Sequence, residues 1–190
     1  MEKAWNEGLR IRKMCAKLVG KKGRTALKRG KSGREGGVSV AGFIGSYSHS
    51  MDAKGRLVIP QSFRDKLGEQ FCVAPSYDFQ SIAIYPTEMW EKRSEAFEKL
   101  GHMNPSLNRY LEQFYALSYS EQACDGQGRV LLPANIRQKI LGEERDVELT
   151  GANDHIRVVA SSVSARSWEQ FRNELPDLLN MIAGLEKQDS

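Results

Sequence analysis

The chain has 190 residues, of which 28 are Lys or Arg and 24 are Asp or Glu, so its formal net charge is +4. This length allows one ordinary domain or two very small ones. Hydrophobic residues make up 40% of the chain, and no stretch approaches the roughly 18 consecutive apolar residues that span a membrane. The three cysteines, Cys15, Cys72 and Cys124, are too few and too widely spaced for a disulfide scaffold or a CxxC metal site. These features predict a reduced, cytoplasmic protein.

The basic charge is concentrated at the start of the chain. Residues 1–37 carry twelve Lys or Arg and three Asp or Glu, a net charge of +9, whereas residues 38–190 carry sixteen and twenty-one, a net charge of −5. Residues 1–42 show no sustained apolar period, so we expect a basic, disordered extension. Three interpretations stay open: a nucleic-acid arm, a solvated tail, or sequence upstream of a true start near Val40. Detection of residues 1–37 in the native protein by mass spectrometry would exclude the last.

One segment of sixteen residues occurs twice, 73 positions apart. Residues 52–67 read DAKGRLVIPQSFRDKL and residues 125–140 read DGQGRVLLPANIRQKI, with six identical positions and five exchanges of one bulky apolar residue for another. The aspartate that opens each copy, Asp52 or Asp125, can accept bonds from backbone N–H groups two residues on. The glycine that follows, Gly55 or Gly128, supplies the positive φ of a tight turn. The sequence therefore predicts two copies of one supersecondary unit.

Each copy predicts a strand, a turn, a second strand, a short helix and a strand hairpin. The runs at residues 57–59 and 130–132 are continuously apolar, which predicts short strands buried on both faces. Pro60 and Pro133 suit the first position of a short helix. A unit this small buries too little surface alone and must pack against its twin. The hairpins are predicted from residues 71–73 with 82–85 and from residues 147–150 with 156–159.

Helices are predicted between the two copies and after the second. Residues 87–100 and 104–117 each carry an apolar stripe behind a helix-starting residue. A third helix is predicted to begin with a capping box at residues 167–170 and to be broken by Pro176. Residues 178–185 then form one more stripe at helical spacing. We favour core packing over a subunit interface for all of these stripes.

The two copies are basic, whereas the rest of the body is acidic. Residues 52–68 and 125–142 together carry seven Lys or Arg and three Asp, a net charge of +4, and the remainder of residues 38–190 has a net charge of −9. Arg56 and Arg129 directly follow the turn glycines, where a guanidinium can project from a loop edge. Phosphates and guanine edges of duplex DNA accept bidentate bonds from Arg. The pattern therefore favours double-stranded DNA as the partner.

Two further arginines lie on the short helices of the repeat. Arg64 and Arg137 are candidate DNA contacts, but each is at least as well explained by pairing with an acidic neighbour to hold the fold. That second role is less expected of Arg56 and Lys54.

No catalytic or cofactor-binding constellation is found in the sequence. The triplets at residues 52–54 and 125–127 lack the hydroxyl residue of the Asp-Thr/Ser-Gly motif of aspartic proteases. His49, His102 and His155 have no further ligands at metal-binding spacing, and no phosphate-binding glycine motif occurs. We expect no enzymatic activity, metal, cofactor, small-molecule substrate or membrane association.

Four segments closely resemble the MraZ family of bacterial transcriptional regulators, which are made of two AbrB-like (SpoVT-AbrB) units. They are FIGSYSHSMDAKGRLVIPQSFRDKL, IAIYPTEMWEK, MNPSLNRYLEQF and EQACDGQGRVLLPANIRQKI. The resemblance runs from about Phe43 to about Trp168. It implies an α+β fold, a pseudo-two-fold swapped-hairpin β-barrel formed by two tandem repeats with connecting and C-terminal helices. The expected segments are a basic extension at 1–42, repeats at 43–90 and 119–163, linking helices at 91–118 and C-terminal helices at 164–190.

The resemblance also implies a function. Members form ring-shaped homo-oligomers and bind short direct repeats in the promoter of the division and cell-wall gene cluster, so a cytoplasmic, nucleoid-associated regulator is expected. The Arg of the first D-x-K-G-R motif contacts DNA in that family, and here it is Arg56, flanked by Lys54. Arg129 is its match in the second copy, with Gln127 where the Lys would be. Two alternatives remain: an antitoxin-type module that also binds a protein partner, and a structural ring that binds no DNA.

Overall fold

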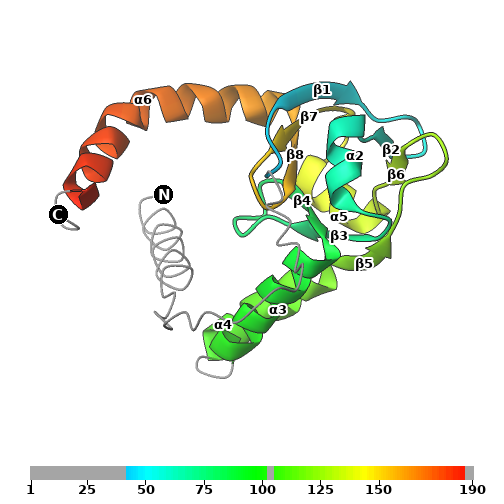
Figure 1. The fold of residues 1–190 in the computed structure, drawn as a ribbon, viewed down its shortest axis with the longest axis horizontal. Coiled ribbons are helices and arrows are strands. Elements are labelled where there is room, and N and C mark those ends of the chain that lie inside the picture. The colour runs from blue at the N-terminus through cyan, green and yellow to red at the C-terminus, as the bar shows by residue number, and fades with distance from the viewer. Residues whose placement is uncertain (1–41, 102–104, 187–190) are drawn as a thin grey trace, which may run out of the picture. The chain divides into compact units, whose positions relative to one another are not determined.

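The computed structural model describes residues 42–101 and 105–186 of the chain (Figure 1). The predicted order of elements is present in both segments. The first segment contains β1 (Ser46–Ser50), β2 (Arg56–Val58), α2 (Gln61–Leu67), β3 (Phe71–Pro75) and β4 (Ile82–Pro86), and the second contains β5 (Tyr119–Gln122), β6 (Arg129–Leu131), α5 (Ala134–Leu141), β7 (Asp146–Gly151) and β8 (Ile156–Ala160). The expectations for residues 1–41 lie outside the described residues. No helix in the described ranges is both long and apolar enough to cross a membrane.

The strands form an antiparallel sheet to which both segments contribute, with β7 and β8 of the second segment lying between β1 and β4 of the first. The six-stranded sheet has the order β1-β7-β8-β4-β3-β5, and β2 pairs with β6 in a separate two-stranded ribbon. The α+β class is therefore confirmed. The strand hydrogen bonds of the described residues do not close the expected barrel, because β1 and β5 each pair on one side only and remain as edges of the sheet.

The central strands β3 and β4 are buried on both faces because each face packs against a different set of elements. Side chains alternate between the faces of a strand. One face packs with the ribbon and with α2 and α5, and it contributes Phe71, Val73, Ile82 and Ile84. The other face packs with the linking helices, and it contributes Cys72, Ala74, Ala83 and Tyr85.

The linking helices are confirmed as core elements. They are α3 (Thr87–Gly101) and α4 (Pro105–Ala116), which lie side by side in Figure 1. Phe97 on α3 and Leu111 and Phe114 on α4 are buried against the sheet. The apolar stripes of these two helices therefore pack in the core, as predicted.

The ribbon strands were predicted to be buried on both faces, and this prediction is wrong. Leu57 and Val130 are buried, whereas Val58 is 40% and Leu131 is 55% exposed. The reason is that a two-stranded ribbon lies over the core as its outermost layer, so only alternate side chains point inward. The two prolines also lie one position earlier than predicted. Pro60, with φ −53° and ψ 143°, and Pro133, with φ −55° and ψ 134°, each precede the first helical residue.

The C-terminal helix differs most from the prediction. A single helix, α6, runs from Ser161 to Glu186 with Pro176 inside it, so the predicted start near Ser167 and the predicted break are both wrong. Figure 1 shows that α6 bends along its length, as a proline that lacks an N–H group allows. Core packing is also wrong for this element, because its large apolar side chains are exposed in the described structure, namely Trp168, Phe171, Leu175, Leu179, Met181 and Ile182.

Candidate nucleic-acid interface

The first turn is organised by one aspartate. Asp52 Oδ1 accepts hydrogen bonds from the backbone N–H groups of Lys54 and Arg56, both at 2.9 Å. Asp52 Oδ2 binds Arg56 Nε at 2.5 Å. Gly55 has a φ of +80°, which closes the turn in the left-handed region. The predicted Asp-turn is confirmed, and in addition the carboxylate holds the Arg56 guanidinium.

The second turn repeats this geometry. Asp125 Oδ1 accepts the backbone N–H groups of Gln127 at 3.0 Å and Arg129 at 2.9 Å, and Oδ2 binds Arg129 Nε at 2.9 Å. Gly128 has a φ of +74°. The Arg129 side chain and then its backbone N–H hold the pKa of Asp125 low, at about 2. Hydrogen bonding, first from the Arg56 backbone N–H, likewise lowers the pKa of Asp52. Both carboxylates are therefore charged at neutral pH.

The two turns share the ribbon. Arg56 lies opposite Leu131 and Val58 lies opposite Arg129 in the β2–β6 register. Beyond the paired residues, Ile59 N donates to Gly128 O at 2.9 Å, and Leu132 N donates to Gly55 O at 3.1 Å. Each turn is thus tied by its glycine carbonyl to the opposite strand. Arg56 and Arg129 are consequently carried by one small rigid element.

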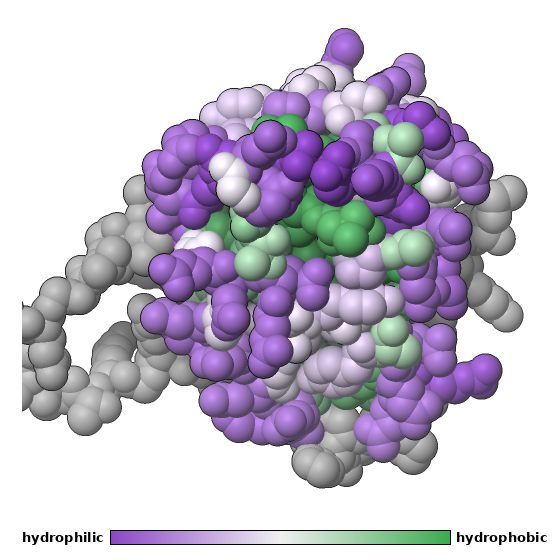
Figure 2. Space-filling view, turned by 90° about the vertical axis from the view of Figure 1, so that its right-hand side faces the viewer, coloured by the Kyte–Doolittle hydropathy of each residue, from purple (hydrophilic) through white to green (hydrophobic). Residues whose placement is uncertain are grey.

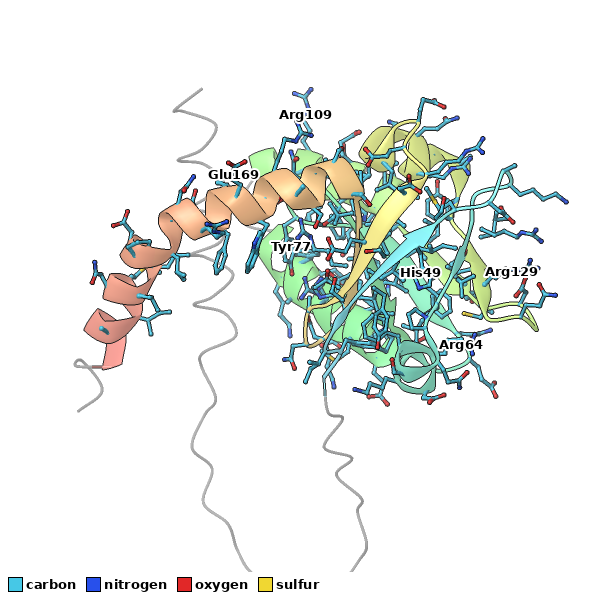
Figure 3. All side chains as sticks on the ribbon, turned by 90° about the horizontal axis from the view of Figure 1, so that it is seen from above. His49, Arg64, Tyr77, Arg109, Arg129 and Glu169 are labelled. Carbon is cyan, nitrogen blue, oxygen red and sulfur yellow. The ribbon has the colours of Figure 1, made fainter. Side chains whose placement is uncertain are left out.

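The helix arginines support the turns from the opposite copy. A Cβ added to Gly55 would overlap Arg137 Nη1, and a Cβ added to Gly128 would overlap Arg64 Nη1. Arg64 also donates through Nη2 to Gln61 Oε1. Figure 3 shows Arg64 and Arg129 at the same end of the molecule. The predicted site residues therefore come together in space, although Arg64 and Arg137 lie against the turns.

The ion pairs of the site arginines are distributed differently from the expectation. Among the four predicted site arginines, Arg56 and Arg129 have carboxylate partners in the described structure, whereas Arg64 lies beside Gln61 and the Gly128 turn. The reason is local, because the turn reverses the chain direction and brings the arginine four residues after each aspartate next to that aspartate. Since a guanidinium has five N–H donors, Arg56, which bonds through Nε alone in the described structure, keeps four donors on its Nη atoms.

Sequence reasoning missed two features of this site. Val58 and Leu131 were expected in the core and instead project from the outer face of the ribbon. The contact of Arg137 with Gly55 joins the two copies, and no local pattern could have indicated it. In the part of the chain that the structure describes, no group of three His, Cys, Asp or Glu side chains could hold a metal ion.

These features define an α+β protein in which two Asp-x-x-Gly-Arg turns share one exposed ribbon. Residues 43–112 match the family model described as "MraZ protein, putative antitoxin-like". The Transcriptional regulator MraZ of Lachnoclostridium phytofermentans is 33% identical over 141 residues, which cover 74% of this chain and 92% of that protein. Its namesake from Symbiobacterium thermophilum is 32% identical over 140 residues, covering 74% and 96%. The namesake from Thermoanaerobacter sp. is 35% identical over 132 residues, covering 68% and 86%. The chain belongs to the MraZ family.

Proposed function

We propose that this protein is a sequence-specific DNA-binding transcriptional regulator. The observation that carries the proposal is the pair of turns that present Arg56 and Arg129 on one ribbon, each held by its own aspartate. An arginine whose orientation is set by a carboxylate loses less entropy when it binds a second planar acceptor. The names of the relatives, each a transcriptional regulator, support the same function.

The distribution of charge favours local over general contact with DNA. Residues 38–190 have a net charge of −5, whereas residues 52–68 and 125–142 together have +4. An acidic body is repelled by the phosphate backbone, so within residues 38–190 contact with DNA is expected from the turns, where Lys54 is exposed beside Arg56. Arg64 and Arg137 remain predicted DNA contacts, and their position against the glycines supports a role in holding the turns.

The finer parts of the proposal concern assembly and target. We infer a ring-shaped homo-oligomer that binds short direct repeats in the promoter of the division and cell-wall gene cluster, in the cytoplasm at the nucleoid. Each subunit offers few contacts to DNA. Once one subunit has bound, its neighbours in the ring are held at high effective concentration near the successive DNA repeats, and this raises the overall affinity. The apolar side chains along α6 are available for subunit contact. The swapped-hairpin relation of the repeats belongs to the same proposal. It is supported by the symmetry of the strand order: exchanging β1 with β5, β3 with β7 and β4 with β8 gives the same order read from the other edge of the sheet.

The test is a gel shift on the region upstream of the protein's own gene. Arg56→Ala should abolish specific retention of the DNA fragment. Arg56→Lys restores the charge but cannot form bidentate bonds, so it should recover little of the specificity. Arg109→Ala is the matched control, because Arg109 is exposed on α4 and lies far from Arg129 in Figure 3. Size-exclusion chromatography verifies that each variant assembles like the wild type. Unchanged retention by Arg56→Ala would show that this arginine does not read DNA.

A second candidate function is an antitoxin-type DNA-binding module with a protein partner. The exposed apolar side chains of α6, with Trp168 at 62% exposure, favour it, since such a stripe can bury a partner segment. Co-purification of a small protein that is released by Trp168→Ala would support this function. If the protein instead purifies without any second protein and still binds DNA strongly, the first proposal is supported.

A further inference from the structure

The outer face of the ribbon combines cationic and apolar side chains in a regular arrangement. Successive side chains alternate between faces, so Arg56 and Val58 share one face of β2, and Arg129 and Leu131 share the same face of β6. In the register, each arginine lies opposite an exposed apolar residue. The outer face of the ribbon therefore carries two arginines and two apolar side chains that alternate both along each strand and across the pair of strands.

The exposure of Val58 and Leu131 is not explained by folding. Their neighbours Leu57 and Val130 already supply the buried face of the ribbon, so a polar residue would serve the outer positions equally well. An apolar residue nevertheless occupies this outer position in each copy of the repeat, Val58 in the first and Leu131 in the second. Figure 2 shows the side of the molecule on which β2 and β6 lie in Figure 1, with an apolar area bordered by hydrophilic residues.

We propose that Val58 and Leu131 contact the 5-methyl groups of thymines in the major groove. This inference rests on the proposed function. A two-stranded ribbon fits the major groove, where the thymine methyl group is the apolar feature that distinguishes A·T pairs. Charge complementarity selects DNA as the occupant, because Arg56 and Arg129 lie opposite the apolar pair in the register and the exposed Lys54 lies in the turn that carries Arg56. The arginines would set affinity and register, and the apolar pair would add a preference for thymine.

The expected effect is a modest and specific loss of affinity. Removing one buried methyl group corresponds to roughly fourfold in an equilibrium constant. The probe is the upstream fragment amplified once with dTTP and ordinary primers and once with dUTP and primers that carry deoxyuridine for thymidine, so that the second duplex lacks every thymine methyl group but keeps its base pairing. Wild-type protein should bind the dUTP fragment about four- to sixteenfold more weakly.

The variant Val58→Ala/Leu131→Ala completes the comparison. It should bind the dTTP fragment as weakly as wild type binds the dUTP fragment, and it should show no further loss on the dUTP fragment. Ile44→Ala is the matched control, because Ile44 is 75% exposed and lies outside the ribbon. That control should keep the full difference between the two fragments.

The outcomes separate this inference from the proposed function. If wild type binds both fragments equally while Arg56→Ala still abolishes binding, the thymine contact is overturned and the regulator stands. If wild type binds neither fragment specifically, both are overturned. If the double variant changes the oligomeric state and keeps the wild-type ratio between fragments, the ribbon face is an interface between copies and the thymine contact is overturned.

Discussion

Arg137 of the second copy lies so close to Gly55 of the first that a Cβ at position 55 would overlap its guanidinium. Arg64 has the same relation to Gly128. Each Asp-x-x-Gly-Arg turn is therefore covered by an arginine from the other copy, and each glycine is needed both for its positive φ and for lack of a side chain. Each turn is linked to the short helix of the other copy as well as to the ribbon.

Substitution of the turn glycine should destabilise the protein. Gly55→Ala places a Cβ in the left-handed region and displaces Arg137, so we expect a loss of about 2 kcal/mol in the free energy of unfolding. Gly126→Ala is the control, since nothing lies within 4 Å of a Cβ there, and a change of at most about 0.5 kcal/mol is expected. Urea unfolding measures both. Equal losses at the two positions would contradict the arginine contact.

The free energy of unfolding should depend on pH through the turn aspartate Asp125. Hydrogen bonds from Arg129 lower the pKa of Asp125 in the folded protein to about 2, so the unfolded chain, with an ordinary Asp pKa of about 3.9, takes up the proton first. This contribution to stability is complete above about pH 4 and is lost as the pH falls towards 2. Thermal unfolding between these pH values should show a smaller slope for Asp125→Asn than for wild type. Gln127→Ala, at an exposed residue of the same turn that has no carboxylate, should keep the wild-type slope.

A second network holds α3 against the second hairpin. Arg93 lies 4.7 Å from the ring centres of Tyr77 and Tyr85, and its Nη2 binds Asp154 Oδ2 at 2.7 Å. Arg93→Ala leaves the partly buried Asp154 without its guanidinium partner, so we expect a loss of about 2 kcal/mol. Lys92→Ala, one residue away and exposed, is the control. Calorimetry of the two variants would disprove the role of this network if their melting temperatures matched.

The start of α6 should depend on one carboxylate of the second copy, that of Glu144. Glu144 accepts hydrogen bonds from Ser162 N at 2.9 Å and from Ser162 Oγ at 2.6 Å, and these bonds lower the pKa of Glu144. Glu144→Ala should therefore remove protection of the Ser162 amide in hydrogen exchange followed by NMR. Glu143→Ala should leave that protection unchanged, and retention of protection in Glu144→Ala would mean that another group holds the helix start.

Much of the fold could be predicted because it depends on local pattern. The turn at Asp52 needs an acceptor at its first position and a glycine at its fourth, and both are visible in the sequence. The stripes of α3 and α4 show helical periodicity and did pack in the core. The error at α6 also has a physical cause: Glu144, from outside the helix, binds Ser162 and so starts the helix earlier than the local capping pattern indicated.

By itself, the sequence determined that there are two copies of one unit, that each has an Asp-x-x-Gly-Arg turn, and that the basic charge of residues 38–190 is concentrated in those copies. Only the tertiary structure decided which faces are exposed and which residues from different copies meet. Leu57 and Val58 are alike in hydrophobicity, and their burial differs because the ribbon covers the core from one side. The contact of Arg137 with Gly55 likewise arises from the pairing of β2 with β6, since only that pairing brings an arginine of one copy to the turn of the other.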